Sequence, residues 1–109
     1  MTESTTQIQL KKGALEMCVL ALLARGESYA YEIASTLAAS VGMGEGTIYP
    51  LMRRMQDDGL VDTRLVESRS GPSRKYYRLT PTGRAALAAQ KREWRTFADA
   101  VNQLLGETK

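Results

Sequence analysis

The side chains with the clearest chemical potential in this sequence lie between Gly46 and Leu60, in the stretch GTIYPLMRRMQDDGL. A helix over 46–58 would place five of them on one face, namely Thr47, Tyr49, Pro50, Arg53 and Arg54. Short hydrogen-bonding groups followed by two arginines suit a helix whose N-terminal half enters a DNA groove. The same residues would also suit the solvated face of an ordinary amphipathic helix, so this stretch alone leaves both interpretations open.

The sequence lacks the residues and motifs on which most catalytic sites depend. The chain has no histidine and a single cysteine, so an imidazole base and a Cys/His zinc site cannot be built. Neither GxGxxG nor the phosphate-binding GxxxxGK[ST] occurs, and the acids show no paired spacing. We therefore expect no enzyme, no metal and no cofactor.

Length and composition indicate one small domain. With 109 residues and 43% hydrophobic content, the core is limited, which favours oligomerisation. The net charge of +3 leans weakly towards an anionic partner. A polar N-terminus and a short apolar run from Met17 to Ala24 predict neither a signal peptide nor a membrane span. One cysteine excludes an internal disulfide, so a cytoplasmic protein is expected.

The elements that position these side chains begin with a helix predicted from about Leu10 to Arg25. Its core-facing stripe comprises Leu15, Cys18, Val19, Leu22 and Leu23, and Cys18 is interpreted as a small buried hydrophobe. A thinner stripe on another face comprises Ala14, Met17 and Ala21, so this helix is expected between two partners. The polar residues 1–9 are predicted to be a disordered tail.

A second helix is predicted from Tyr29 to about Ser40, with Ser28 as its cap. Tyr29 could donate a hydrogen bond to a phosphate, or its ring could form a shelf over the core. The glycine-rich residues 41–46 then form a turn, which completes a helix-turn-helix pattern with the helix over 46–58.

The helix over 46–58 has well-defined limits. Its predicted core stripe is Ile48, Leu51, Met52 and Met55. Gly46 and Thr47 are expected to cap it, and Pro50 is expected in the first turn, where a missing N–H is tolerated. Gly59 should end it in a left-handed conformation.

A β-hairpin over 61–79 is predicted next, with a loop from Arg69 to Ser73 and a second strand from Arg74 to Leu79. Between Ser68 and Arg84 there are five basic residues and no acid. Such a hairpin suits phosphate binding or contact with a minor groove. It could instead be a solvated hairpin that shields a sheet edge.

A long helix should start at Thr80 and Pro81 and reach about Leu105, roughly 38 Å at 1.5 Å per residue. Its apolar residues recur as a coiled-coil-like seam, and the predicted dimerisation residues are Leu87, Trp94, Phe97, Val101 and Leu104. The chain has no further helix to cover this seam. A second copy of the chain is the simplest partner, and two-fold pairing would present two reading helices to successive major grooves.

Three strings together resemble the PadR family of bacterial transcriptional regulators: SYAYEI (28–33), GTIYPLMRRMQDDGLV (46–61) and GPSRKYYRLTPTGR (71–84). The resemblance spans about residues 10–105, and the single C-terminal helix is similar to the short subclass. It implies a mainly α (α+β) winged helix-turn-helix fold with a two-stranded β wing and a long C-terminal dimerisation helix. The implied division is a tail over 1–9, a DNA-binding domain over 10–79 and a dimerisation helix over 80–109.

The resemblance also implies a homodimer, usually a repressor, that binds inverted repeats in double-stranded DNA. The DNA contacts that it carries over are Tyr29, Thr47, Tyr49, Pro50, Arg53, Arg69, Arg74 and Lys75. Two departures are Ala30, where the family usually has glycine, and 71–73, where an additional arginine often precedes the proline. The rival interpretation is a winged-helix protein-interaction module without sequence-specific DNA binding.

Trp94 occupies a position where some short members similar to this chain stack flat aromatic ligands between subunits. Met17, Ala21 and Ala98 would be the lining residues of such an effector site. Stacking gives a large apolar contact with little directional demand, which suits a planar aromatic effector. Trp94 could instead only anchor the dimer.

Overall fold

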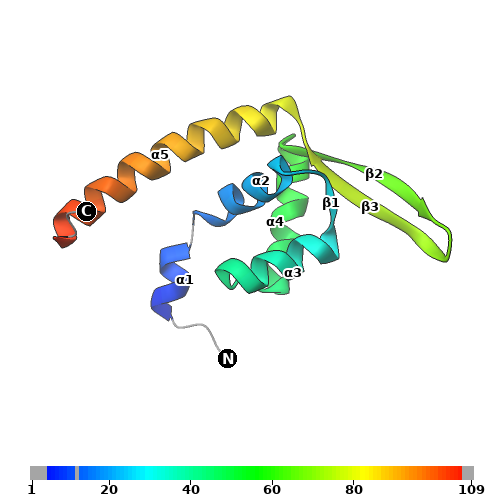
Figure 1. Cartoon of the computed structure of the whole chain (residues 1–109), viewed down its shortest axis with the longest axis horizontal. Helices are drawn as coiled ribbons and strands as arrows, with labels where there is room; N and C mark the ends of the chain where they lie inside the picture. Colours follow the sequence, from blue (N-terminus) through cyan, green and yellow to red (C-terminus); the bar gives the residue numbers. More distant parts are fainter. Residues whose placement is uncertain (1–4, 12, 107–109) are drawn as a thin grey trace.

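The chain, described by a computed structural model over residues 5–11 and 13–106, folds as a helical body from which two long arms extend (Figure 1). The elements in order are α1 (Thr5–Lys11), α2 (Leu15–Ala24), β1 (Ser28–Tyr29), α3 (Ala30–Val41), α4 (Glu45–Asp57), β2 (Val61–Ser68), β3 (Gly71–Leu79) and α5 (Pro81–Leu105). Helices α2, α3 and α4 form the body. The β2–β3 hairpin, the wing, leaves it on one side and α5 on the other.

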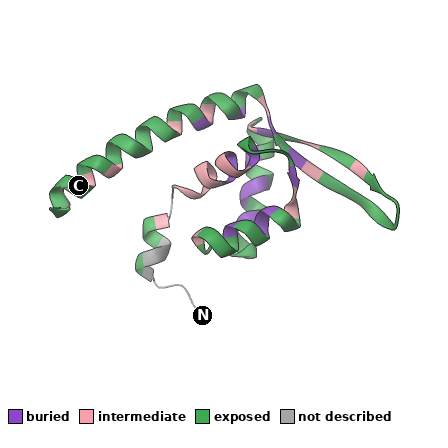
Figure 2. Ribbon diagram, in the orientation of Figure 1, coloured by how far each residue is buried: buried purple, intermediate pink, exposed green. Residues whose placement is uncertain are grey.

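The core lies where α2, α3 and α4 meet the inner face of the sheet, and the two arms are largely exposed (Figure 2). The predicted stripe of α4 is buried at all four positions, as its i, i+3, i+4 and i+7 spacing requires. In α2 the fully buried residues are Val19, Leu20 and Leu23, while Leu15, Cys18 and Leu22 are half-buried. The buried face of α2 is therefore rotated towards Leu20 from the predicted stripe.

The first predicted helix is in fact two helices. Gly13 has φ +92°, a left-handed conformation that ends a helix, and the Ala14 N–H bonds the Lys11 carbonyl at 2.9 Å. The tail expected over residues 1–9 also differs, because its residues from Thr5 onwards belong to α1. Residues 1–4 lie outside the described residues. Polarity indicated that this stretch contacts water, but glutamine, leucine and lysine also favour helical backbone.

The sheet has three antiparallel strands in the order β1-β3-β2, one more than the expected two-stranded wing. Ser28 pairs with Tyr77, so it is a strand residue and Tyr29 takes the N-cap position of α3. The Ser28 hydroxyl donates instead to the Glu32 carboxylate. The predicted loop over 69–73 shortens to two residues, because β3 already begins at Gly71.

Helix α4 begins earlier than predicted, after Gly44, so Pro50 lies inside the helix and not in its first turn. Proline has no N–H to donate, and its ring crowds the carbonyl one turn earlier, here that of Gly46. Ile48 and Leu51 on either side are buried, which holds the helix together across the missing hydrogen bond. Gly59, with φ +78°, follows the end of the helix as predicted.

The start of α5 is fixed to the end of α4. The Thr80 hydroxyl accepts from the Gly83 N–H at 2.9 Å and donates to the Gly59 carbonyl at 2.6 Å. Gly83 is buried, and a Cβ there would lie 2.1 Å from the Leu60 carbonyl oxygen. The helix then runs beyond the core, and its last contact with the core is Leu87, which is buried within the chain. Leu87 therefore does not belong to the exposed seam in which it was predicted.

No helix within residues 5–11 and 13–106 is long and apolar enough to cross a membrane.

Candidate nucleic-acid interface

The exposed face of α4 carries all five of the residues predicted there, opposite the buried stripe. They divide into two flanks. One flank faces a cleft towards α5 and comprises Thr47, Pro50 and Arg54. Tyr49 and Arg53 are exposed but do not line this cleft. The two neighbouring arginines therefore point to different surroundings, which the sequence spacing alone did not indicate.

The wing presents its basic residues near its free end. Register pairs Val66 with Arg74 and Leu65 with Lys75, which places the two cations on opposite faces of the hairpin. Arg69 lies in the two-residue turn between the strands. All three cations are exposed, and none of them forms an ion pair within residues 13–106.

Two other arginines of the wing are neutralised by acids. Arg64 donates two hydrogen bonds to the Glu27 carboxylate, at 2.8 and 2.6 Å, and Arg78 donates to Asp62 at 2.7 Å. The hydrogen bond from Arg64 lowers the pKa of the Glu27 carboxyl below its ordinary value. Sequence reasoning missed the first pair because its partners lie far apart along the chain, and it overestimated the free positive charge of the wing.

Tyr29 links the wing to the start of α3. The Arg74 guanidinium carbon lies 4.4 Å from the centroid of the Tyr29 ring, and the Tyr29 and Tyr76 rings meet edge to face at 5.4 Å. Tyr29 is half-buried, and its ring contacts these wing residues. The ring also borders a depression of about 550 Å³ with Arg74 and Lys75. The arrangement thus leaves both interpretations of Tyr29 open and places two cations beside it that could receive a phosphate.

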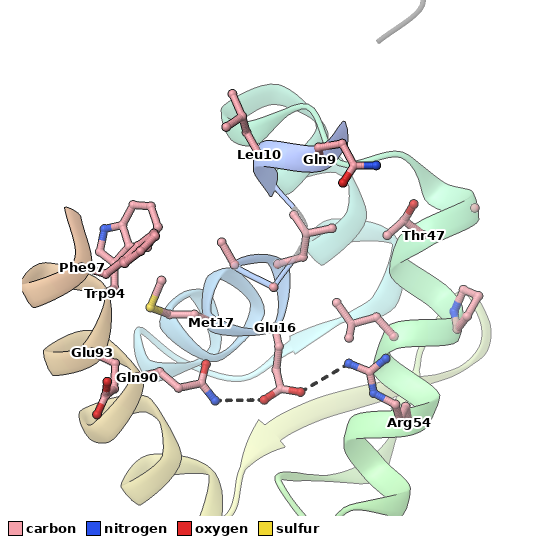
Figure 3. A pocket seen from close by; sticks show the side chains of 16 residues that line it. Gln9, Leu10, Glu16, Met17, Thr47, Arg54, Gln90, Glu93, Trp94 and Phe97 are labelled. Atoms are coloured by element: carbon pink, nitrogen blue, oxygen red, sulfur yellow. Dashed lines mark hydrogen bonds and ion pairs between the residues drawn. The ribbon is translucent and has the colours of Figure 1, made fainter. Parts of the chain in front are cut away.

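The cleft between α4 and α5, called here the α4–α5 cleft, has a volume of about 1150 Å³ and is bordered also by α1 and α2 (Figure 3). Trp94 and Phe97 form its α5 wall, and Met17 of α2 lies close to Trp94. Two of the four predicted effector residues are therefore brought together. Ala21 and Ala98 do not line the cleft, and Ala21 packs against the core because the buried face of α2 is rotated.

A polar bridge crosses the wall of this cleft. Glu16 of α2 accepts from Arg54 at 3.4 Å through one carboxylate oxygen and from Gln90 of α5 at 2.9 Å through the other (Figure 3). Sequence reasoning did not single out Glu16. The available signal was a lone charge in the otherwise apolar helix LEMCVLALLA, because such a group needs partners when it is partly buried.

A helix-turn-helix followed by an antiparallel hairpin defines the winged helix-turn-helix class, so the predicted mainly α (α+β) fold is confirmed. The sequence model of the Transcriptional regulator PadR-like family matches residues 19–89. The chain therefore belongs to the PadR-like family of transcriptional regulators, as its motifs predicted.

Known relatives agree with this assignment. A PadR-like transcriptional regulator from Bacillus cereus is 39% identical, with a TM-score of 0.81 over 89% of this chain and 96% of that one. Bacillus subtilis PadR, solved in complex with operator DNA, is 27% identical with a TM-score of 0.64, over 71% of this chain and 46% of that one. Transcriptional regulator Rv3488 of Mycobacterium tuberculosis is 41% identical over 58 residues, which is 51% of each protein.

Proposed function

We propose that this PadR-family regulator is a cytoplasmic homodimeric repressor, without catalytic activity, that binds inverted-repeat operator DNA and responds to a planar aromatic effector. Residues 10–79 would form the DNA-binding unit, and residues 80–109 would form the dimerisation helix. The observation that carries the proposal is the exposed, arginine-bearing face of α4 beside a wing with three cations that form no ion pair within residues 13–106. A relative with this fold was solved on operator DNA.

The proposed contacts divide between base reading and backbone binding. The N-terminal half of α4, with Thr47, Tyr49 and Pro50, would enter the major groove, where hydroxyl and apolar groups meet base edges. Arg53 and Arg54 lie further along the helix and would bind guanine or phosphate. The backbone contacts proposed for the wing and for the start of α3 are Arg69, Arg74, Lys75 and Tyr29.

A second copy of the chain is supported by the exposed apolar side of α5. Phe97 is 64% exposed and Leu104 is 89% exposed, so nothing in the described part of the chain covers them. Trp94 and Val101 continue the same seam. Pairing through this seam would set two α4 helices to read half-sites about 34 Å apart.

The proposed effector site is the α4–α5 cleft. A flat ligand stacked on Trp94 would contact Met17, while Thr47 and Pro50 on the α4 wall border the same space. A ligand bound in this cleft would therefore change the separation or orientation of the two α4 recognition helices. Trp94 is the sole tryptophan, so quenching of its fluorescence by a planar cationic dye reports on this site. Absence of quenching with the dimer intact would leave Trp94 a structural role.

The DNA-binding proposal is tested by fluorescence anisotropy on an inverted repeat from the DNA upstream of this gene and on a scrambled duplex of equal length. We expect tighter binding to the inverted repeat. We also expect log K to fall with log salt by about 0.9 for each phosphate contact. Equal, nearly salt-independent binding to both duplexes would instead indicate the winged-helix protein-interaction module.

A matched pair of wing variants sharpens this test. Lys75→Gln removes a cation that forms no ion pair within residues 13–106, so it should lower the salt slope by about 0.9 on both duplexes. Arg78→Gln removes a cation that already pairs with Asp62, so it should lower the slope less. Equal loss in the two variants would contradict the assignment of Lys75 as a phosphate contact.

A further inference from the structure

The two adjacent arginines of α4 are held differently. Arg53 is exposed and forms no ion pair within residues 13–106. The Arg54 side chain, which is 61% exposed, is paired with Glu16, whose own side chain is only 24% exposed. Glu16 is therefore enclosed by the body of the protein, whereas the guanidinium of Arg54 can also be reached from outside.

The contact between Glu16 and Arg54 is weak enough for a DNA phosphate to displace it. The nitrogen–oxygen distance is 3.4 Å, long for a charge-assisted hydrogen bond, and an exposed pair is screened by salt. A phosphate that approaches α4 would compete with the Glu16 carboxylate for the same guanidinium. The carboxylate also offsets the positive charge that Arg54 presents to DNA.

The second oxygen of Glu16 connects this pair to α5. Gln90 donates to it at 2.9 Å and lies one turn before Trp94, on the same wall of the α4–α5 cleft. A change in the position of α5 relative to α2 would therefore stretch or release the bond that orients the carboxylate. The three side chains come from three different helices and meet at one point (Figure 3).

We propose that Glu16 is a positioning residue that holds Arg54 on the cleft side of α4 and limits its contact with DNA phosphate. Gln90 makes this restraint depend on α5. The inference rests on the proposed DNA-binding function and deepens it. Arg53 is the permanently available arginine of α4, whereas Arg54 is fully available only when Glu16 releases it.

The direct test measures the salt slope of operator binding for Glu16→Gln, with Glu93→Gln as the control. Glu93 lines the same cleft, and in the described part of the chain it forms no ion pair with Arg54. Glu16→Gln should steepen the slope by up to about 0.9, one more phosphate contact, and tighten binding by up to about fivefold. Glu93→Gln should change the slope less. Equal effects of the two variants would overturn the proposal, because general charge removal would then explain both.

The single variants Arg53→Gln and Arg54→Gln change exposed residues only, so their comparison stays informative if Glu16→Gln unfolds. Arg53→Gln should lower the salt slope of the otherwise unchanged protein by about 0.9, and Arg54→Gln should lower it clearly less. In the Glu16→Gln background, Arg54→Gln should abolish the gain in slope. Equal losses for Arg53→Gln and Arg54→Gln would overturn the restraint.

The role of Gln90 is tested separately. Gln90→Ala should shift the slope in the same direction as Glu16→Gln but by less, because the untethered carboxylate samples other rotamers. An unchanged slope would overturn the dependence on α5. If the unsubstituted protein shows no salt-dependent preference for the inverted repeat, the proposed function itself fails. If the unsubstituted protein does show that preference but Glu16→Gln has no effect distinct from that of Glu93→Gln, only the inference about Glu16 fails.

Discussion

At the residue scale, glycines of this chain differ in how much space is available for a Cβ atom at their positions. Gly46 lies in α4 with open space around its Cβ position, whereas a Cβ on Gly83 would lie 2.1 Å from the Leu60 carbonyl oxygen. The close approach lets α5 start against the end of α4, where Thr80 bonds the Gly59 and Leu60 carbonyls. Absence of a side chain at Gly83 thus sets the direction in which α5 leaves the body.

We expect Gly83→Ala to lower the free energy of unfolding by about 3 kcal/mol, the upper end for overpacking, because backbone must move to admit the methyl group. Gly46→Ala is the control and should raise the same free energy by up to about 1 kcal/mol, since alanine favours helix. Urea unfolding followed by circular dichroism measures both. A Gly83→Ala protein as stable as the parent would show that the α4–α5 junction is not tightly packed.

At the element scale, the wing is joined to the body by contacts that cross the sheet. Glu27 precedes β1 and reaches Arg64 on β2, while β3 lies between the two strands. On the same side of the sheet, Arg74 covers the Tyr29 ring. An exposed ion pair adds little to global stability, but we expect this one to restrict the angle of an arm that is otherwise solvated.

The Glu27–Arg64 contact should make the order of the wing depend on pH. Because the hydrogen bond from Arg64 lowers the pKa of Glu27 in the folded protein, its contribution is present above the carboxyl's ordinary pKa. It is lost only in acid, as pH falls through the lowered pKa. NMR order parameters for β2 should therefore be high at neutral pH and decrease in acid.

Glu27→Gln should give low β2 order parameters at neutral pH, without the change in acid. Asp62→Asn removes a pair within the hairpin and leaves the contact with the body, so it is the matched control. If Glu27→Gln and the parent protein have the same order parameters at neutral pH, the contact does not restrain the wing.

The elements differ in how far sequence could predict them. Helix α5 was predicted almost to the residue, because Thr80 and Pro81 start it and its apolar spacing is long and regular. Strand β1 was missed, since two residues carry no alternation and their partners, Tyr76 and Tyr77, lie far along the chain. The position of Pro50 was misjudged because tertiary burial of α4 outweighs the local cost of proline.

The candidate site was predictable in part for the same reason. Periodicity indicated which side chains of α4 avoid the core, and these are exposed. It could not distinguish Arg53 from Arg54, because that difference depends on Glu16 and Gln90, contributed by two other helices. Ala21 and Ala98 were predicted by resemblance to line a site between subunits, and that prediction stays open, although neither residue lines the α4–α5 cleft of the single chain.

At the scale of the whole molecule, the arms account for an extent of 55 Å along the longest axis against 24 Å along the shortest. The distal part of α5 carries Phe97 and Leu104 on a surface that the described part of the chain does not cover. Contiguous apolar surface of this kind is characteristic of an association site. Because Leu104 is 89% exposed, a substitution there tests association without disturbing the core.

We expect Leu104→Glu to convert the dimer to a monomer, because pairing would bury a carboxylate of each copy in the apolar seam at a cost that apolar burial cannot offset. Gln103→Glu is the matched control: the same charge is added to the neighbouring exposed residue, outside the seam. Sedimentation velocity would give the mass, and circular dichroism would check that the helical content is unchanged. The monomer should also bind an inverted repeat and an isolated half-site with equal affinity, since linked binding to two half-sites requires two joined copies. A Leu104→Glu protein that remains dimeric would contradict the proposed seam, and a parent protein that is monomeric would contradict the homodimer itself.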